Sequence, residues 1–377
     1  MRKLQSLFLA LLLLPMLALA QQLPTPPALA AKSWLLIESG SGQELASQNA
    51  DNRLDPASLT KLMTAYITFG ALKQGTIKID QMVQVSEKAW KAEGSRMFIQ
   101  VNTQVKVEDL IKGMIVQSGN DACVALSEAI AGSEDNFVQM MNREAQRLGM
   151  KATSFRNSAG LPDPQHYTTA RDLAALAGAL IRDFPEDYAK YYSIKEFRYN
   201  NITQPNRNRL LWLDPTVDGM KTGHTEAAGY CLISSAKRGP RRLLSVVLGA
   251  SSDAVRAQES LKLLNFGFQF YDAVQLYTKD QAVSALKVWK GTEKTVNAGF
   301  THDFILAVPK GYAPRLKSEL VSQQPLMAPV SAGQVVATMK VSLDGKPFGE
   351  YPVVAITAVP VAGIFGRAID TMRLWFN

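Results

Sequence analysis

Ser58 and Lys61 have the residue types and the spacing that acyl transfer requires. Residues three apart on a helix share a face, so the Lys61 amine can reach the Ser58 hydroxyl. A serine becomes a strong nucleophile when a base takes its proton, and a lysine held partly neutral can be that base. The pair alone is weak evidence, because Ser-x-x-Lys also occurs at 234–237 and 284–287. Those copies fall in or beside predicted strands, where residues three apart point to opposite faces.

A second polar motif, Ser118-Gly119-Asn120, separates helices predicted over 107–116 and 121–130. A polar break between two buried helices is expected to turn its side chains into a cleft. There Ser118 can relay a proton between Lys61 and a leaving amine, and Asn120 can hold a substrate amide. Taken alone, such a cluster is also typical of an ordinary turn, and residues 47–49 have the same form.

The third motif runs from Lys221 to Thr225, after a predicted turn at 218–219 and before a predicted strand. Lys221 and the threonine hydroxyls can bind a substrate carboxylate, and Gly223 leaves room for a ligand along a strand edge. Its plainer interpretation is the polar start of a strand. The residues predicted to bind substrate are Asn120, Lys221, Thr222, Gly223, His224 and Thr225.

The elements around these motifs are helices mixed with late strands. Periodicity predicts helices over 58–72, 171–182 and 254–268, and strands over 33–38, 230–234 and 243–248. This order predicts a catalytic domain at residues 21–272, of the α/β (α+β) class, with helices around an antiparallel sheet.

Beyond residue 272 short strands replace helical periodicity, over 286–289, 304–308, 335–341 and 353–359. They predict a small all-β domain at 273–360. Residues 361–377 then show an amphipathic helical pattern, which indicates a helix that lies on a membrane surface. The alternative is a helix docked on the β domain.

The first twenty residues have the pattern of a secretory signal: Arg2 and Lys3, an apolar run, then Ala18-Leu19-Ala20 as a cleavage site. The alternative is an N-terminal anchor helix.

In an oxidising compartment Cys123 and Cys231 can pair, although two free thiols are equally compatible with the sequence. The net charge is +8, but the sequence has no block of lysines and arginines of the kind that lines a nucleic-acid groove. The histidines lack metal-ligand spacing, so we predict no metal and no cofactor.

The order Ser-x-x-Lys, Ser-x-Asn, Lys-Thr-Gly matches the set used by penicillin-binding proteins and serine β-lactamases. Residues 56–64, 118–122 and 218–225 resemble those of the low-molecular-mass D-alanyl-D-alanine carboxypeptidases, penicillin-binding proteins of the type 5 and 6 class in the S11 peptidase family. Asn206-Arg207-Asn208 also resembles this family. The resemblance covers almost the whole chain, including the signal, the β domain and the tail.

The resemblance implies that Ser58 forms an acyl ester, Lys61 accepts its proton, Ser118 is a second active serine and Lys221 binds substrate. The backbone N–H groups of Ser58 and His224 would form the oxyanion hole. It also implies a transpeptidase-like fold, with Cys123 near the site and Arg256 near the substrate carboxylate. Ala159 departs from the family, because some relatives carry histidine there.

By the same resemblance the partners are peptidoglycan stem peptides, β-lactam inhibitors and a membrane surface, with no nucleic acid. The location is then periplasmic, at the outer face of the cytoplasmic membrane. A β-lactamase shares the motifs, but residues 151–170 contain no glutamate to activate water. A D,D-endopeptidase uses the same catalytic set and is also compatible with the sequence. So is a non-catalytic wall-binding or drug-sensing module that retains the fold.

Overall fold

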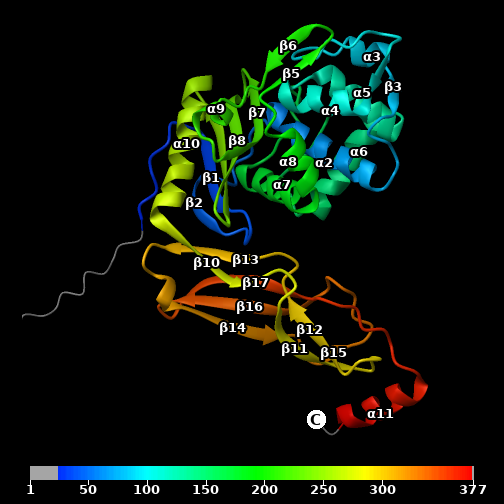
Figure 1. The fold of residues 1–377 in the computed structure, drawn as a ribbon, viewed down its shortest axis with the longest axis vertical. Coiled ribbons are helices and arrows are strands. Elements are labelled where there is room, and N and C mark those ends of the chain that lie inside the picture. Colours follow the sequence, from blue (N-terminus) through cyan, green and yellow to red (C-terminus); the bar gives the residue numbers. More distant parts are fainter. Residues whose placement is uncertain (1–23, 376–377) are drawn as a thin grey trace, which may run out of the picture.

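The computed structural model describes residues 24–375, so the predicted signal at 1–20 lies outside the described residues. Figure 1 shows two parts stacked along the long axis, a mixed helix and sheet part above and an all-β part below. The long helix α10 (Asp253–Phe270) leads from the first part into the second.

A five-stranded antiparallel sheet forms the centre of the upper part, in the order β2-β1-β9-β8-β7. Its strands are β1 (Ser33–Glu38), β2 (Glu44–Gln48), β7 (Val217–Thr225), β8 (Gly229–Arg238) and β9 (Arg241–Ala250). Alternate residues of β9 enter different cores: Leu244 and Val246 face one, Leu243 and Val247 the other. That alternation is the period-two geometry of a strand, and it lets helices cover both faces.

On one face α10 packs against β8 and β9. On the other face α7 (Ala170–Asp183) lies against β9, and a helical cluster follows beyond it. That cluster contains α2 (Lys61–Lys73), α3 (Glu87–Trp90), α4 (Val107–Val116), α5 (Asn120–Ala131), α6 (Glu134–Arg147) and α8 (Pro185–Tyr191). Helix α2 is buried on nearly all sides, so it is a central core helix that fixes the residues at its start.

Most predicted elements of this part are confirmed, but several differ. The predicted helix over 58–72 begins as a 3₁₀ turn, η1 (Ala57–Thr60), and becomes α-helical only at Lys61. Helix α6 was not predicted, although Phe137, Met141 and Ala145 recur every four residues on its buried side. Short elements that were not predicted are the helices α3, α8 and α9 (Leu210–Leu213) and the strands β3 (Met82–Gln84), β4 (Gln104–Lys106), β5 (Glu196–Tyr199) and β6 (Ile202–Pro205).

The turn predicted at 218–219 is wrong, because both residues lie inside β7. The pairing of β7 with β8 shifts between Val217 and Gly219, so Asp218 is the extra residue of a β-bulge. The Tyr188 hydroxyl donates to Asp218 at 2.7 Å, and a Cβ on Gly219 would lie 2.4 Å from that hydroxyl. Asp-Gly thus marks a bulge with a close side-chain approach rather than a chain reversal.

The lower part is all-β, as predicted. Strand β10 (Tyr271–Tyr277) pairs with β13 (Phe304–Pro309), and six further strands form a sheet in the order β14-β16-β17-β12-β11-β15. These are β11 (Ala282–Trp289), β12 (Thr295–Gly299), β14 (Leu316–Ser322), β15 (Leu326–Met327), β16 (Val335–Leu343) and β17 (Lys346–Ala355). The strand predicted over 353–359 is wrong beyond Ala355. A turn at Asp344-Gly345, both with positive φ, instead starts β17 earlier.

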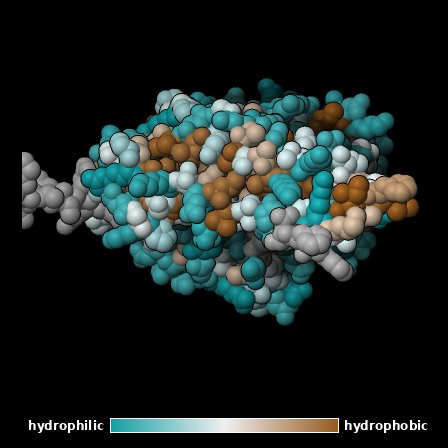
Figure 2. Space-filling model, turned by 90° about the horizontal axis from the view of Figure 1, so that it is seen from below, coloured by the Kyte–Doolittle hydropathy of each residue, from teal (hydrophilic) through white to brown (hydrophobic). Residues whose placement is uncertain are grey.

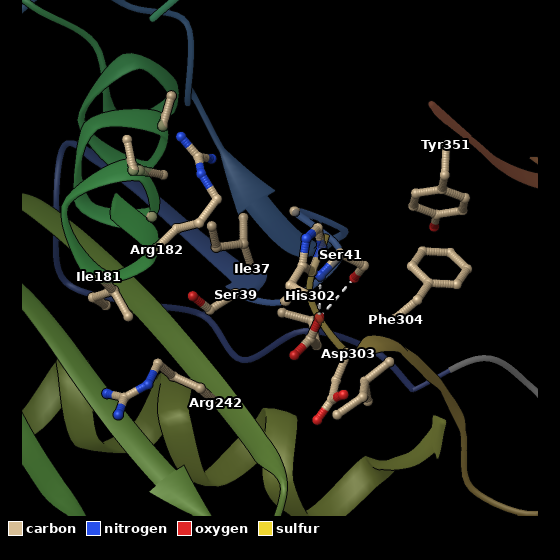
Figure 3. A pocket seen from close by; sticks show the side chains of 18 of the residues that line it. Ile37, Ser39, Ser41, Ile181, Arg182, Arg242, His302, Asp303, Phe304 and Tyr351 are labelled. Carbon is tan, nitrogen blue, oxygen red and sulfur yellow. Dashed lines mark hydrogen bonds between the residues drawn. The ribbon is translucent and has the colours of Figure 1, made fainter. Parts of the chain in front are cut away.

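The two parts meet through side chains that pair with backbone. The Gln43 amide donates to the Ala307 carbonyl at 2.8 Å and accepts from the Ala307 N–H at 3.1 Å, which imitates one step of strand pairing. Arg241 donates to the Tyr271 carbonyl at 2.6 Å. Figure 3 shows the cleft beside this joint, with Arg182 and Arg242 from the upper part. Carboxylates already pair with both arginines.

The chain ends in α11 (Ile364–Trp375), which projects below the β domain (Figure 1). Between residues 24 and 375 no helix combines the length and the apolar character needed to cross a bilayer.

Replacing Gly267 of α10 with alanine should destabilise the protein. A Cβ there would lie 2.6 Å from Leu243 Cδ1 and 2.9 Å from Leu36 Cδ2, and overpacking a core typically costs about 1–3 kcal/mol. The matched control is Gly178→Ala in α7, where a Cβ meets nothing within 4 Å. There the gain in helix propensity should add roughly 0.5–1 kcal/mol. Urea denaturation measures both, and equal stabilisation by both alanines would contradict the tight contact between α10 and the sheet.

Candidate active site

The three motifs, which lie far apart in the sequence, meet at one place. Lys61 Nζ lies 3.0 Å from Ser58 Oγ and 2.7 Å from Asn120 Oδ1. Lys221 Nζ lies 3.0 Å from Ser118 Oγ. Each of the three motifs therefore contributes a polar side chain to one network.

Three elements hold this network in place. Ser58 lies in the 3₁₀ turn η1, which packs against β7. Gly223 of β7 permits that contact, since a Cβ there would lie 3.1 Å from the Pro56 carbonyl oxygen. Ser118 lies between the end of α4 and the start of α5, with a positive φ of 64°. The other two Ser-x-x-Lys copies lie inside strands, the one at 234–237 in β8 and the one at 284–287 in β11.

Lys61 is buried, and its amine has three oxygen neighbours. Besides Ser58 Oγ, these are Asn120 Oδ1 at 2.7 Å and the Ala159 carbonyl oxygen at 2.6 Å. The last two can only accept hydrogen bonds. A neutral amine has two N–H bonds and one lone pair. The two fixed acceptors therefore take both N–H bonds, and the lone pair faces the Ser58 hydroxyl.

Electrostatics favour this neutral amine. Burial, together with the Arg207 cation, lowers the pKa of Lys61 to about 8, whereas Asp121 opposes the shift. Cys123 lies nearby, but burial raises the pKa of its thiol to about 12, so it is uncharged near neutral pH. Near pH 8 a large fraction of Lys61 is therefore an available base.

Lys221 is buried as well, and its amine donates to Ser118 Oγ at 3.0 Å and to the Thr222 carbonyl at 2.9 Å. Burial, and next the nearby Lys61, hold its pKa well below the ordinary lysine value. Two buried lysines in one site disfavour each other's charge, whereas an anion bound beside Lys221 would favour the charged form of that amine.

The remaining predicted binding residues lie along β7. Thr222 is buried, while His224 is exposed and its ring lies 4.0 Å from the Tyr230 ring, centre to centre. Thr225 Oγ1 accepts from the Ala228 N–H at 3.1 Å, in the turn between β7 and β8. Its oxygen therefore stabilises a turn, and the hydroxyl proton and the second lone pair are left to contact a ligand.

The sequence did not reveal the role of the loop at 157–161. Asn157 Oδ1 accepts from the N–H groups of Ala159, Gly160 and Leu161, so the turn presents the Ala159 carbonyl to Lys61. Gly160 has a φ of 86°, and a Cβ there would lie 1.8 Å from the Ala57 carbonyl oxygen. Since a backbone atom contacts Lys61, the alanine that departs from the family still supplies this contact.

Two arginines add to the positive charge. Arg256 is buried, donates to the Gly223 carbonyl at 3.2 Å and pairs with Asp253. Arg207 lowers the pKa of both Lys61 and Lys221. In the sequence Arg207 stood out only as part of a segment that resembles the family, and no role was predicted for it.

Cys123 and Cys231 are both buried free thiols, so they do not pair in this structure.

A serine that faces a buried neutral lysine, beside a second serine and lysine, is the arrangement that a serine acyl-transfer enzyme with a lysine base needs. The family model for D-alanyl-D-alanine carboxypeptidase, peptidase S11, matches residues 20–252. That for the penicillin-binding protein 5 C-terminal domain matches residues 271–361. The chain therefore belongs to the peptidase S11 family.

Individual relatives agree with this. The D-alanyl-D-alanine carboxypeptidase DacC of Escherichia coli K12 is 44% identical over 95% of this chain and 91% of its own length. Penicillin binding protein 5 of Haemophilus influenzae has a similar structure, with a TM-score of 0.78 and 42% identity over 89% of this chain and 99% of that one. Ampicillin-bound penicillin-binding protein D2 of Listeria monocytogenes gives 0.60 and 30%, over 65% of this chain and all of that one.

Replacing Arg207 with glutamine should raise the pKa of Lys61, because the guanidinium cation lowers it in the native protein. Arg209→Gln is the matched control, since Arg209 pairs with Asp253 and is not among the groups that shift Lys61. NMR titration of ¹³C-labelled lysine side chains, assigned with Lys61→Arg, measures the pKa. An unmoved Lys61 signal in Arg207→Gln, or equal shifts in both variants, would contradict the assigned cause.

Proposed function

We propose that this chain is a serine-type D-alanyl-D-alanine carboxypeptidase, which removes the terminal D-alanine of peptidoglycan pentapeptides through an acyl-enzyme on Ser58. The observation that carries the proposal is the set of contacts around Lys61, whose two N–H bonds have fixed acceptors while its lone pair faces Ser58. The relatives' names support the substrate.

In the first step Ser58 Oγ attacks the carbonyl carbon of the penultimate D-alanine, and Lys61 takes the hydroxyl proton. The oxyanion that forms is stabilised by the backbone N–H groups of Ser58 and His224. The C–N bond then breaks as the proton held by Lys61 passes through Ser118 to the leaving amine, which returns Lys61 to its neutral form. Lys221 holds Ser118 in place for this transfer. Free D-alanine departs and an ester to Ser58 remains.

The carboxylate of the terminal residue needs a positive subsite. Lys221, Thr222 and the neighbouring arginines supply it along β7, and Asn120 holds the amide of the bound peptide. In the second step water attacks the ester carbonyl carbon and Lys61 takes its proton. Lys61 then gives this proton to Ser58 Oγ as the acyl C–O bond breaks, and the shortened peptide departs. A β-lactam forms the same ester by ring opening, as the ampicillin-bound relative suggests.

Ser58→Ala should abolish both D-alanine release from a D-Ala-D-Ala peptide and labelling by a fluorescent penicillin. The expected loss is on the order of 10⁴-fold or more, because the nucleophile and its base act as a unit. Ser284→Ala, within the second Ser-x-x-Lys copy, should leave both unchanged. In the native protein acylation should rise with pH through about 8, since Lys61 must be neutral to act as base. Labelling retained in Ser58→Ala, or a flat profile, would refute these roles.

We also propose that the protein is exported to the periplasm and rests on the outer face of the cytoplasmic membrane through α11. Asp370 accepts from the Lys290 N–H at 2.7 Å, so this polar residue faces the β domain. The exposed apolar residues of the helix are Ile364, Phe365, Ile369 and Met372. Figure 2 shows the same end of the molecule with apolar residues gathered on its surface. An outward apolar face suits a membrane interface.

The double variant Phe365→Asp/Met372→Asp should lose affinity for vesicles that contain anionic phospholipid, by roughly tenfold or more, since each side chain contributes about 1.5–3 kcal/mol on burial. Met82→Asp is the control, because Met82 is 48% exposed, comparable to 61% for Met372, but lies in the catalytic part. Co-sedimentation with vesicles measures binding. Equal binding by the native and doubly substituted proteins would exclude α11 as the anchor.

A further inference from the structure

Asp121, the residue after the Ser-Gly-Asn motif, holds the loop at residues 93–99 through its carboxylate. The side chain is buried. Its Oδ1 accepts from the Met97 N–H at 3.0 Å, and its Oδ2 accepts from Phe98 and Ile99 at 2.8 and 3.2 Å. A carboxylate that accepts several backbone N–H groups forms charge-assisted bonds, which are stronger than neutral ones. Asp121 thus fixes the backbone of this loop.

The same loop holds Asn120 at both its backbone and its side chain. The Asn120 backbone N–H donates to the Ser95 carbonyl at 2.6 Å, and its Nδ2 donates to the Glu93 carbonyl at 2.5 Å. A Cβ on Gly94 would lie 2.8 Å from Nδ2, so glycine lets the loop close on the amide. With Nδ2 committed to the loop, Oδ1 must face the other way, toward Lys61 at 2.7 Å.

The direction of this amide determines whether Lys61 can act as a base. An amide turned by 180° would present an N–H donor to the Lys61 nitrogen. That donor would bind the lone pair of the neutral amine, which must remain free for the Ser58 proton. The same donor would repel the protonated amine, which has no acceptor. The reversed amide would therefore block the neutral amine and destabilise the charged one.

We propose that Asp121 is a positioning residue for acylation: through the 93–99 loop it fixes the direction of the Asn120 amide, and so keeps the Lys61 lone pair on Ser58. The inference rests on the proposed roles of Ser58 and Lys61. Asp121 contacts neither residue: it positions the amide through the loop, and its charge acts on Lys61 only at a distance.

The sign of the pH effect follows from the charges that face Lys61. Arg207 precedes α9, Lys221 lies on β7, and Asp121 lies beside the neutral Cys123 on α5. The Asp121 carboxylate stabilises the charged amine, and so does the Asn120 oxygen that accepts from it. Asp121→Asn removes the first effect and weakens the second. Both changes lower the pKa of Lys61, so the acid limb of the acylation profile should move to lower pH.

The test measures the rate of acylation by a fluorescent penicillin from pH 6 to 10 on the full chain. In Asp121→Asn the plateau rate should fall roughly 10- to 100-fold, as small misplacements of catalytic groups do, and the acid limb should move down. Glu38→Gln is the matched control. Glu38 is equally buried and its carboxylate accepts two bonds from Ser41 in the β1–β2 turn. Ser41 lies at the cleft between the domains, beside His302 (Figure 3). Glu38→Gln should therefore leave both the plateau rate of acylation and the acid limb of the pH profile unchanged.

A second variant, Gly94→Ala, keeps the Asp121 charge but places a Cβ against the Asn120 amide. Gly94→Ala should lower the plateau rate of acylation in the same way, with a smaller shift of the acid limb of the pH profile. This variant tests the proposal if Asp121→Asn does not fold. The proposal is overturned if the folded variants keep the native plateau. It is also overturned if the rate falls only in proportion to the fraction of active protein while the limb stays in place. Failure of the native protein to be acylated at Ser58 would instead refute the proposed function.

Discussion

The structure depends on one constraint, which is that a lysine amine must be buried and neutral beside a serine hydroxyl. Burial alone lowers the pKa of Lys61, but it would leave the direction of the lone pair free. Two oxygens that can only accept, one on Asn120 and one on the Ala159 backbone, remove that freedom. Much of the surrounding architecture serves to place these two oxygens. Helix α2 fixes Lys61, the helix break fixes Asn120, and a glycine turn fixes Ala159.

The sequence was sufficient to predict the side chains of this arrangement but not the backbone that directs them. Ser58, Lys61, Ser118 and Lys221 were predicted because three motifs, each weak alone, occur together in the order that the resembled family uses, and because Ser58 lies at a predicted helix start. The Ala159 carbonyl was not, since every residue carries a carbonyl and only the fold shows which one faces an amine. The nearest signals were Asn157 and Gly160, a pattern that predicts a loop without indicating what the loop contacts.

The same limit explains the errors in the fold. Strands and helices with clear periodicity, such as β16 and α4, were predicted because burial of one face determines both pattern and structure. Asp218-Gly219 was taken as a turn because local preference favours one there. The Tyr188 hydroxyl packs over Gly219, and an aspartate that binds both tyrosine and Arg242 makes a bulge favourable instead. Contacts that lie 24 or 30 residues away in sequence leave no local pattern.

A neutral lysine in a core has a thermodynamic consequence for the whole domain. The pKa of Lys61 falls from 10.5 to about 8 on folding, so below pH 8 the group opposes folding by roughly 3 kcal/mol. This penalty decreases as the pH rises from the folded pKa toward the unfolded one, above which the amine is neutral in both states. Lys221 adds a penalty of the same sign. The all-round burial of α2 and the two cores on either face of the sheet offset these terms. The neutral form of Lys61 therefore depends on the stability of the surrounding fold, because loosening α2 or the helix break would let water reach the amine and favour its charge.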